Sequence, residues 1–90
     1  MIVKVSDYGI ADKNFIEYVV KGLKSDQINF LKNNLDEECE VCGDDLKIVM
    51  YFDDNLYPFH SDVFKIRPDD FIAREEIEMN VFLSSFLEDM

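Results

Sequence analysis

The sequence predicts a single α+β domain over residues 1–90, and three observations support that class. Nearly half of the residues are apolar, including eight Phe and four Tyr, which is enough for one core despite a net charge of −11. Disordered acidic segments lack this apolar content. Strand-like and helix-like segments alternate in the approximate order β-α-α-β-β-β-α. We therefore expect helices packed on a mostly antiparallel sheet.

The N-terminal segment is expected to form a short strand and then a helix. Residues 2–5 are mostly β-branched, and residues 8–9 can end the strand. The helix is expected over residues 12–23, where Asp12 can cap it and Gly22 can stop it. The apolar side chains of this segment fall at the spacings of one helical face: Phe15, Ile16, Val19, Val20 and Leu23.

A second helix is expected from Ser25 to the acidic run at residues 36–38. Ser25 can serve as its N-cap, and Ile28, Leu31 and Leu35 lie on one face. Two helices joined by a short turn also occur in DNA-reading domains. The second helix carries few basic side chains, so we interpret the pair as packing elements.

The remaining chain predicts three strands and a long helix. Residues 39–42 alternate, residues 43–45 have turn chemistry, and residues 46–52 are rich in strand formers, which together indicate a hairpin. The unbroken apolar end of the second hairpin strand indicates a central strand covered on both faces. Another strand is expected at 63–67, and a helix at 69–87, where a proline and two aspartates suit the first turn.

Charge is the most informative feature of the sequence. Residues 1–35 contain five Lys and four acidic residues, a net charge of +1, whereas residues 36–90 contain four basic and sixteen acidic residues, a net charge of −12. The sign excludes nucleic acid and anionic membrane as direct ligands, because those polyanions need Lys and Arg. The acidic region is either a solvated coat or a face that docks a basic partner.

A docking face would draw on acidic side chains of this second region and on the aromatic side chains among them. The aromatic residues are included because protein interfaces commonly centre on aromatic anchors with charges at the rim. The candidate contact residues are Asp44, Asp45, Asp53, Asp54, Asp69, Asp70, Glu75, Glu76, Glu78, Tyr51 and Tyr57.

Motifs for catalysis or metal binding are weak in this sequence. Cys39 and Cys42 have acidic neighbours, which oppose the thiolate that redox chemistry requires. With His60 they make three ligands, one short of a structural zinc site unless an acid such as Asp62 completes the set. His60 is the sole histidine, and the three glycines form no phosphate-binding loop. We therefore expect a protein that is not an enzyme and that holds neither metal nor cofactor.

The location expected from the sequence is cytoplasmic. The first residues lack the basic and apolar regions of a secretory signal, and no apolar run reaches the length of a membrane span. Two cysteines without such a signal are expected to stay reduced. For a phage-encoded protein the compartment would be the host cytoplasm.

These features favour a non-enzymatic acidic module that binds proteins. The expected partner is a basic protein surface, in particular the nucleic-acid-binding surface of a larger protein that the module would inhibit. In size, charge and lack of motifs the chain resembles phage-encoded anti-CRISPR proteins, anti-restriction proteins and other DNA mimics, although no shared motif carries the resemblance. An immunity protein or antitoxin fits equally well.

Two alternatives stay open. The first is a structural or assembly subunit that forms a homodimer and buries Ile77 and Val81. The second is a small metal or redox protein that uses Cys39 and Cys42.

Overall fold

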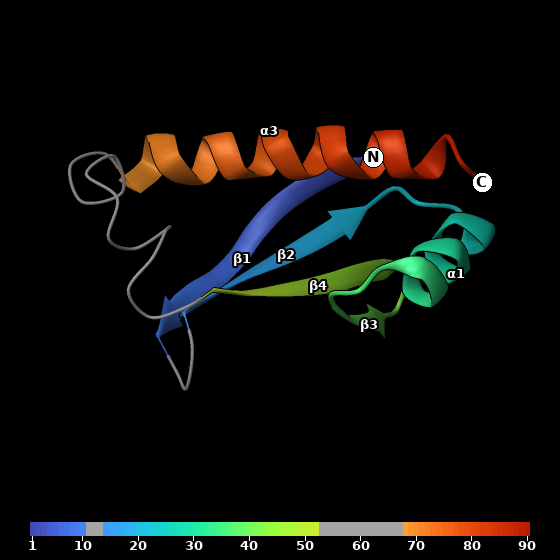
Figure 1. Ribbon diagram of the computed structural model, residues 1–90, viewed down its shortest axis with the longest axis horizontal. Coiled ribbons are helices and arrows are strands. Elements are labelled where there is room, and N and C mark those ends of the chain that lie inside the picture. The colour runs from blue at the N-terminus through green and yellow to red at the C-terminus, as the bar shows by residue number, and fades with distance from the viewer. Residues whose placement is uncertain (11–13, 53–67) are drawn as a thin grey trace.

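The computed structural model describes residues 1–10, 14–52 and 68–90 and confirms the α+β class. Within these residues, four strands form one antiparallel sheet in the order β1-β2-β4-β3, and two helices pack on it (Figure 1). The elements are, in chain order, β1 (Ile2–Ile10), β2 (Asn14–Lys21), α1 (Ser25–Asn34), β3 (Glu38–Cys42), β4 (Asp45–Phe52) and α3 (Pro68–Leu87).

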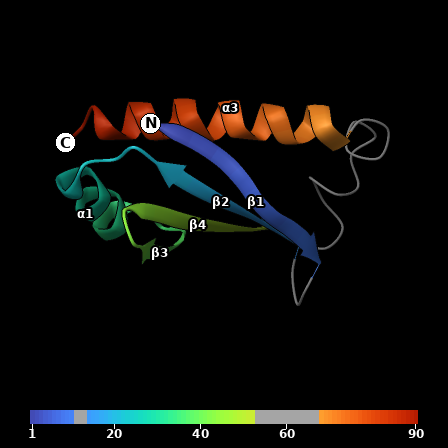
Figure 2. The same cartoon turned by 180° about the vertical axis from the view of Figure 1, so that it is seen from behind.

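One face of the sheet, called the inner face here, carries the core. Side chains from β2 and β4 are buried on it, namely Ile16, Tyr18, Val20, Leu46 and Ile48. Ile28 and Leu31 of α1 and Phe71, Met79 and Leu83 of α3 join them in one cluster. In both views α3 runs along the length of the sheet, and α1 lies below the C-terminal part of α3 (Figures 1 and 2).

The opposite, outer face of the sheet is more open. Its side chains on β2 and β4 include Glu17, Val19, Lys47 and Val49, which are half-buried, and Tyr51, which is exposed. β4 lies between β2 and β3, so the prediction of a central strand is confirmed. Within the described residues, both helices pack on the inner face of the sheet and Tyr51 on the outer face of β4 is exposed, so for this part of the chain the prediction that both faces are covered is wrong.

The main error of the sequence prediction lies in residues 14–21. They form β2, not a helix, and they pair with both β1 and β4. The spacing of the apolar residues fits both the period of a helix, about 3.6 residues, and the two-residue period of a strand. Burial alternates along the segment, and β-branched and aromatic residues dominate it, as is typical of a strand. β1 is also longer than expected, since it continues through residues 8–9 to Ile10.

The predicted hairpin, the helix from Ser25 and the C-terminal helix are confirmed. The hairpin of β3 and β4 and the C-terminal helix are present, and Pro68, Asp69 and Asp70 open α3. The helix predicted from Ser25 is present as α1, but Lys24, not Ser25, occupies the cap position. The strand expected at 63–67 lies outside the described residues.

The two edges of the sheet differ. Along β1, a register irregularity falls between Val5 and Asp7, and the amide of Val5 donates to Oε2 of Glu76 at 2.8 Å. Asn80 Nδ2 donates to the carbonyl of Met1, just before β1, at 3.4 Å, so α3 holds the backbone at one residue of β1 and at the residue that precedes the strand. In the described part of the chain, β3 pairs with β4 alone, and four of its five residues are exposed. The β3 edge is therefore the open one.

Candidate interaction surface

Six carboxylates gather along β3 and the turns at its two ends. Alternation in the strand directs Glu38 and Glu40 to the outer face, beside Val49 and Lys47 of β4. The others lie in the turn before β3 or in the β3–β4 turn and the start of β4. We call this set the acidic edge: Asp36, Glu37, Glu38, Glu40, Asp44 and Asp45.

Two of these carboxylates are paired. Lys47 Nζ lies 3.6 Å from Glu40 Oε2 and 3.6 Å from Glu17 Oε1, and Lys21 Nζ lies 3.6 Å from Asp45 Oδ2. Glu17 and then Glu40 raise the pKa of Lys47, so it stays protonated. Among the described residues, the six carboxylates are matched by two paired lysines, one of which also pairs with Glu17, so the acidic edge carries an excess of at least four negative charges.

The outer side of the acidic edge includes one aromatic side chain. The hydroxyl of Tyr51 donates to Oε2 of Glu38 at 2.7 Å, and the ring is exposed. This hydrogen bond, followed by burial and by the charge of Glu38, raises the pKa of Tyr51. The hydroxyl therefore remains a donor at neutral pH and orients the Glu38 carboxylate.

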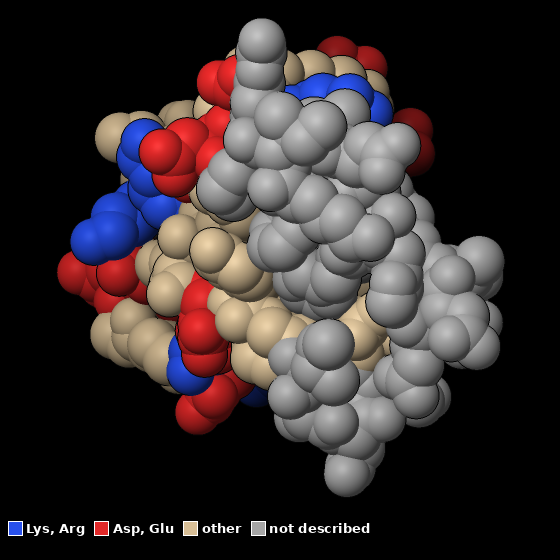
Figure 3. All heavy atoms as spheres, turned by 90° about the vertical axis from the view of Figure 1, so that its left-hand side faces the viewer, with Lys and Arg blue, Asp and Glu red and all other residues tan. Residues whose placement is uncertain are grey.

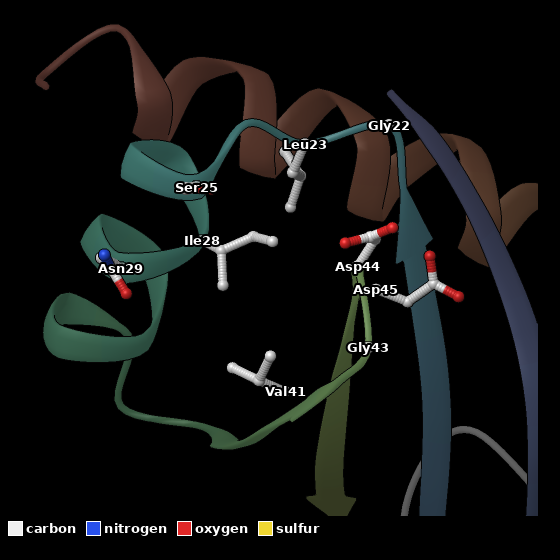
Figure 4. A pocket seen from close by; sticks show the side chains of 9 residues that line it. All are labelled: Gly22, Leu23, Ser25, Ile28, Asn29, Val41, Gly43, Asp44 and Asp45. Carbon is white, nitrogen blue, oxygen red and sulfur yellow. The ribbon is translucent and has the colours of Figure 1, made fainter.

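A hollow of about 430 Å³ adjoins the acidic edge between α1 and the β3–β4 turn. Ile28 and Val41 point toward each other across it, and Asp44 and Asp45 lie on the side away from α1 (Figure 4). Its lining includes apolar side chains on the side of α1 and carboxylates on the side of the β3–β4 turn. Such a hollow suits a ligand with an apolar group next to a positive charge.

A second cavity, of about 200 Å³, opens at the other end of β3. Glu37 lines it together with residues of the sheet and of α3: Tyr18, Met50, Glu75, Glu78, Met79 and Phe82. Glu75 is 7% exposed, and the hydroxyl of Tyr18 donates to its Oε2 at 3.2 Å. Burial of a carboxylate requires such partners. The acidic edge thus has a hollow bordered by carboxylates at each end.

The predicted contact residues do not all come together. Asp44, Asp45 and Tyr51 belong to the acidic edge or adjoin it. Asp69 and Asp70 open α3, at the end of the molecule opposite α1 (Figure 1). On that end, acidic and basic side chains of the described elements lie beside one another (Figure 3).

The three predicted glutamates of α3 bind other side chains or backbone groups of this domain, although Glu75 and Glu78 also line the cavity next to Glu37. Glu75 is buried against Tyr18, Glu76 accepts the β1 amide, and Glu78 pairs with Arg74, whose Nε lies 3.2 Å from Glu78 Oε1. Three predicted residues, Asp53, Asp54 and Tyr57, lie outside the described residues.

Four residues of the acidic edge are not among the predicted contact residues: Asp36, Glu37, Glu38 and Glu40. The first three were expected to end the second helix, but Glu38 begins β3. Glu40 lies in the strand predicted at 39–42, and its alternation with Cys39 and Val41 was the signal that it faces outward.

The two cysteines of β3 point to opposite faces of the sheet. Cys39 lies opposite Ile48 and is half-buried, whereas Cys42 lies opposite Asp45 and is exposed. Burial, and then the charge of Glu37, raises the pKa of the Cys39 thiol, which keeps it protonated at neutral pH. Among the described residues, no three His, Cys, Asp or Glu side chains are grouped so that they could hold a metal ion.

Fold and surface together define a small α+β domain with a strongly acidic open sheet edge. A family model matches residues 2–89, and the chain belongs to that family, DUF5750, a family of unknown function. Comparison with curated proteins finds no match. In the part of the chain that the structure describes, neither helix has the length and apolar character to cross a membrane.

Proposed function

We propose that this protein is a non-enzymatic module that binds a basic surface of another protein through the acidic edge. The observation that carries this proposal is the excess of at least four negative charges among the described residues of the acidic edge, which follows an exposed strand and the turns at its ends. Complementary charge speeds encounter with a basic partner and rejects acidic ones. The free cysteines agree with a cytoplasmic setting, which is part of the proposal.

A basic nucleic-acid-binding surface is the partner class that we favour. Such surfaces are built for polyanions and accept carboxylates at their phosphate positions. A DNA mimic in the strict sense needs carboxylates spread along a long face. Of the sixteen described carboxylates, six lie on the acidic edge and the other ten are spread over the rest of the described residues. We therefore propose a compact contact of that edge with part of the partner's surface. Inhibition of the partner would follow from occupying its nucleic-acid site.

The test is affinity capture with three forms of the protein. The first is the wild type, the second carries Glu38→Gln and Glu40→Gln, and the third carries Glu88→Gln and Asp89→Asn. Both variants lose two negative charges, but Glu88 and Asp89 lie near the end of the chain, just beyond α3.

We expect wild type and the Glu88/Asp89 variant to retain the same protein, and the Glu38/Glu40 variant to lose it at least tenfold. The retained protein should be basic. Its affinity should fall steeply between 0.05 and 0.5 M salt, because the Debye length falls from roughly 14 to 4 Å. Equal capture by all three forms, or salt-independent binding, would contradict the proposal.

Self-association is a second candidate, because one apolar surface is exposed on the β1 side of α3. Ile77 and Val81 are 66% and 62% exposed, and Ile2 is 57% exposed beside them. They line a groove of about 480 Å³ between α3 and β1. Light scattering tests this candidate: a dimer that persists at high salt and is abolished by Ile77→Glu would support it.

A further inference from the structure

We infer that the β3 edge binds an extended basic segment of the partner as a fifth strand of the sheet. This inference rests on the proposed function and specifies how the acidic edge engages its partner. Extended segments add to open sheet edges through main-chain hydrogen bonds, and side-chain contacts at alternate positions determine which segment is accepted.

Among the described residues, the free side of β3 meets no other strand, whereas α3 contacts the backbone within β1 and just before its start. Glu76 accepts the amide of Val5 in β1, and Asn80 donates to the carbonyl of Met1 just before the strand, so these two backbone groups are taken by α3. The backbone of β3 pairs on one side with β4, and in the described residues no other strand meets its far side. Edge groups of this kind are templates for another chain.

Charges alternate in sign across the outer face of the sheet. Negative Glu17, positive Lys47 and negative Glu40 lie on three successive strands, with Lys47 3.6 Å from a carboxylate oxygen of each neighbour. A strand added beyond β3 would continue this alternation with a positive side chain next to Glu40. Glu38 lies two residues away on the same face, so a second positive side chain would follow two positions along the added strand.

The inner face of the same edge carries the side chains of Cys39 and Val41. Between Glu38 and Glu40 the side chain of Cys39 points inward, and Val41 beyond them does the same. Val41 is exposed and borders the hollow against α1 (Figure 4). An apolar side chain between the two basic ones would lie on this inner side. The preferred ligand is therefore an extended segment in which basic and apolar residues alternate.

The acidic edge also determines which occupant is excluded. Pairing of β3 with β3 of a second copy would bring two sets of carboxylates together, and like charges across strands are destabilising. The same residues that attract a basic segment thus keep two copies of this chain from pairing through their edges.

The test uses short synthetic peptides in which lysine alternates with valine. One peptide is unmodified, one is N-methylated at the lysine amides, and one is N-methylated at the valine amides. Successive amides of a strand point to opposite sides, so one methylated peptide loses the hydrogen bonds to β3 and the other keeps them. Binding is followed by titration and by the amide NMR signals of residues 38–42.

We expect one methylated peptide to bind about ten- to hundredfold more weakly than the unmodified peptide, and the other to bind within about threefold of it. Glu38→Gln with Glu40→Gln should weaken the unmodified peptide at least tenfold, whereas Glu88→Gln with Asp89→Asn should not. Circular dichroism of both variants confirms that they fold.

Two outcomes separate this inference from the proposed function. If all three peptides bind equally and the Glu38/Glu40 variant weakens them equally, the edge attracts basic chains without adding a strand, and only the inference is overturned. If no peptide perturbs residues 38–42 and the captured partner is insensitive to Glu38 and Glu40, the proposed function is overturned as well.

Discussion

The contact between Glu76 and the amide of Val5 should stabilise the fold measurably, and Glu76→Ala tests this. Hydrogen bonds to charged acceptors contribute about 1.5–3 kcal/mol. Glu76 is half-buried, so water can reach the released amide and reduce the loss. We expect Glu76→Ala to lower the free energy of unfolding by about 1–2 kcal/mol, and Glu76→Gln, which keeps an acceptor, by about half as much.

Glu78→Ala is the matched control. It changes the same residue type on the same helix, so the changes in charge and helix propensity are alike. Glu78 pairs with Arg74 four residues earlier, and both side chains are more than half exposed. Such exposed pairs contribute about 0.3–0.5 kcal/mol.

Urea denaturation followed by circular dichroism measures both variants. The difference between them should be about 1 kcal/mol, equivalent to a midpoint difference of about 5 °C on heating. If Glu76→Ala and Glu78→Ala agree within about 0.3 kcal/mol, α3 does not secure β1 as the structure indicates, and the contrast between the two sheet edges loses its basis.

Three further predictions concern stability. Tyr18→Phe should lower the free energy of unfolding, measured by denaturant titration, by about 1–2 kcal/mol, because the buried carboxylate of Glu75 loses a donor. Tyr51→Phe removes a hydrogen bond at an exposed site and should lower it by less than about 0.5 kcal/mol. Equal losses for the two variants would contradict this prediction. Gly43→Ala should cost about 1 kcal/mol because Gly43 has a φ of 63°, and Gly43→Asn should cost less, so a neutral Ala variant would refute the argument. Folding raises the pKa of Cys39, Tyr51 and Lys47, whose ordinary values are 9.0, 10.0 and 10.5. Their contribution to the free energy of unfolding is therefore present at neutral pH and is lost as the pH rises above those values. A free energy of unfolding that stays constant up to about pH 11 would contradict this direction.

The class of fold could be predicted because it depends on local signals. The β3–β4 hairpin follows from turn residues between two strand-forming runs, and α3 follows from Pro68 and two aspartates ahead of a wide apolar face. These signals lie within a few residues of the elements they define, so no knowledge of the rest of the chain was needed.

β2 was missed because its apolar residues satisfy two periods at once. Ile16 and Val20 are four residues apart, which suits a helix, and both also belong to the alternating set of a strand. Tyr18 distinguishes the two interpretations: it falls outside the predicted helical face, yet it is fully buried between Ile16 and Val20. A large aromatic residue in the middle of an alternating, β-branched segment was the signal to follow.

The candidate surface could be predicted only in part. The excess of acidic residues after residue 35 is visible in the sequence, and so is the hairpin that contains Asp44 and Asp45. That β3 is an edge strand depends on strand order, which is set by pairings between residues distant in sequence. The contacts of Glu75 with Tyr18 and of Glu76 with Val5 depend on how α3 crosses the sheet. No pattern in the neighbouring sequence predicts them.

Amide hydrogen exchange, measured with and without the captured partner, shows which strand binds it. We expect alternate amides within Glu38–Cys42 to exchange more slowly once the partner is bound, while amides of β1 change little. Slower exchange confined to α3 around Ile77 and Val81, with β3 unaffected, would contradict it and would assign recognition to the apolar groove instead.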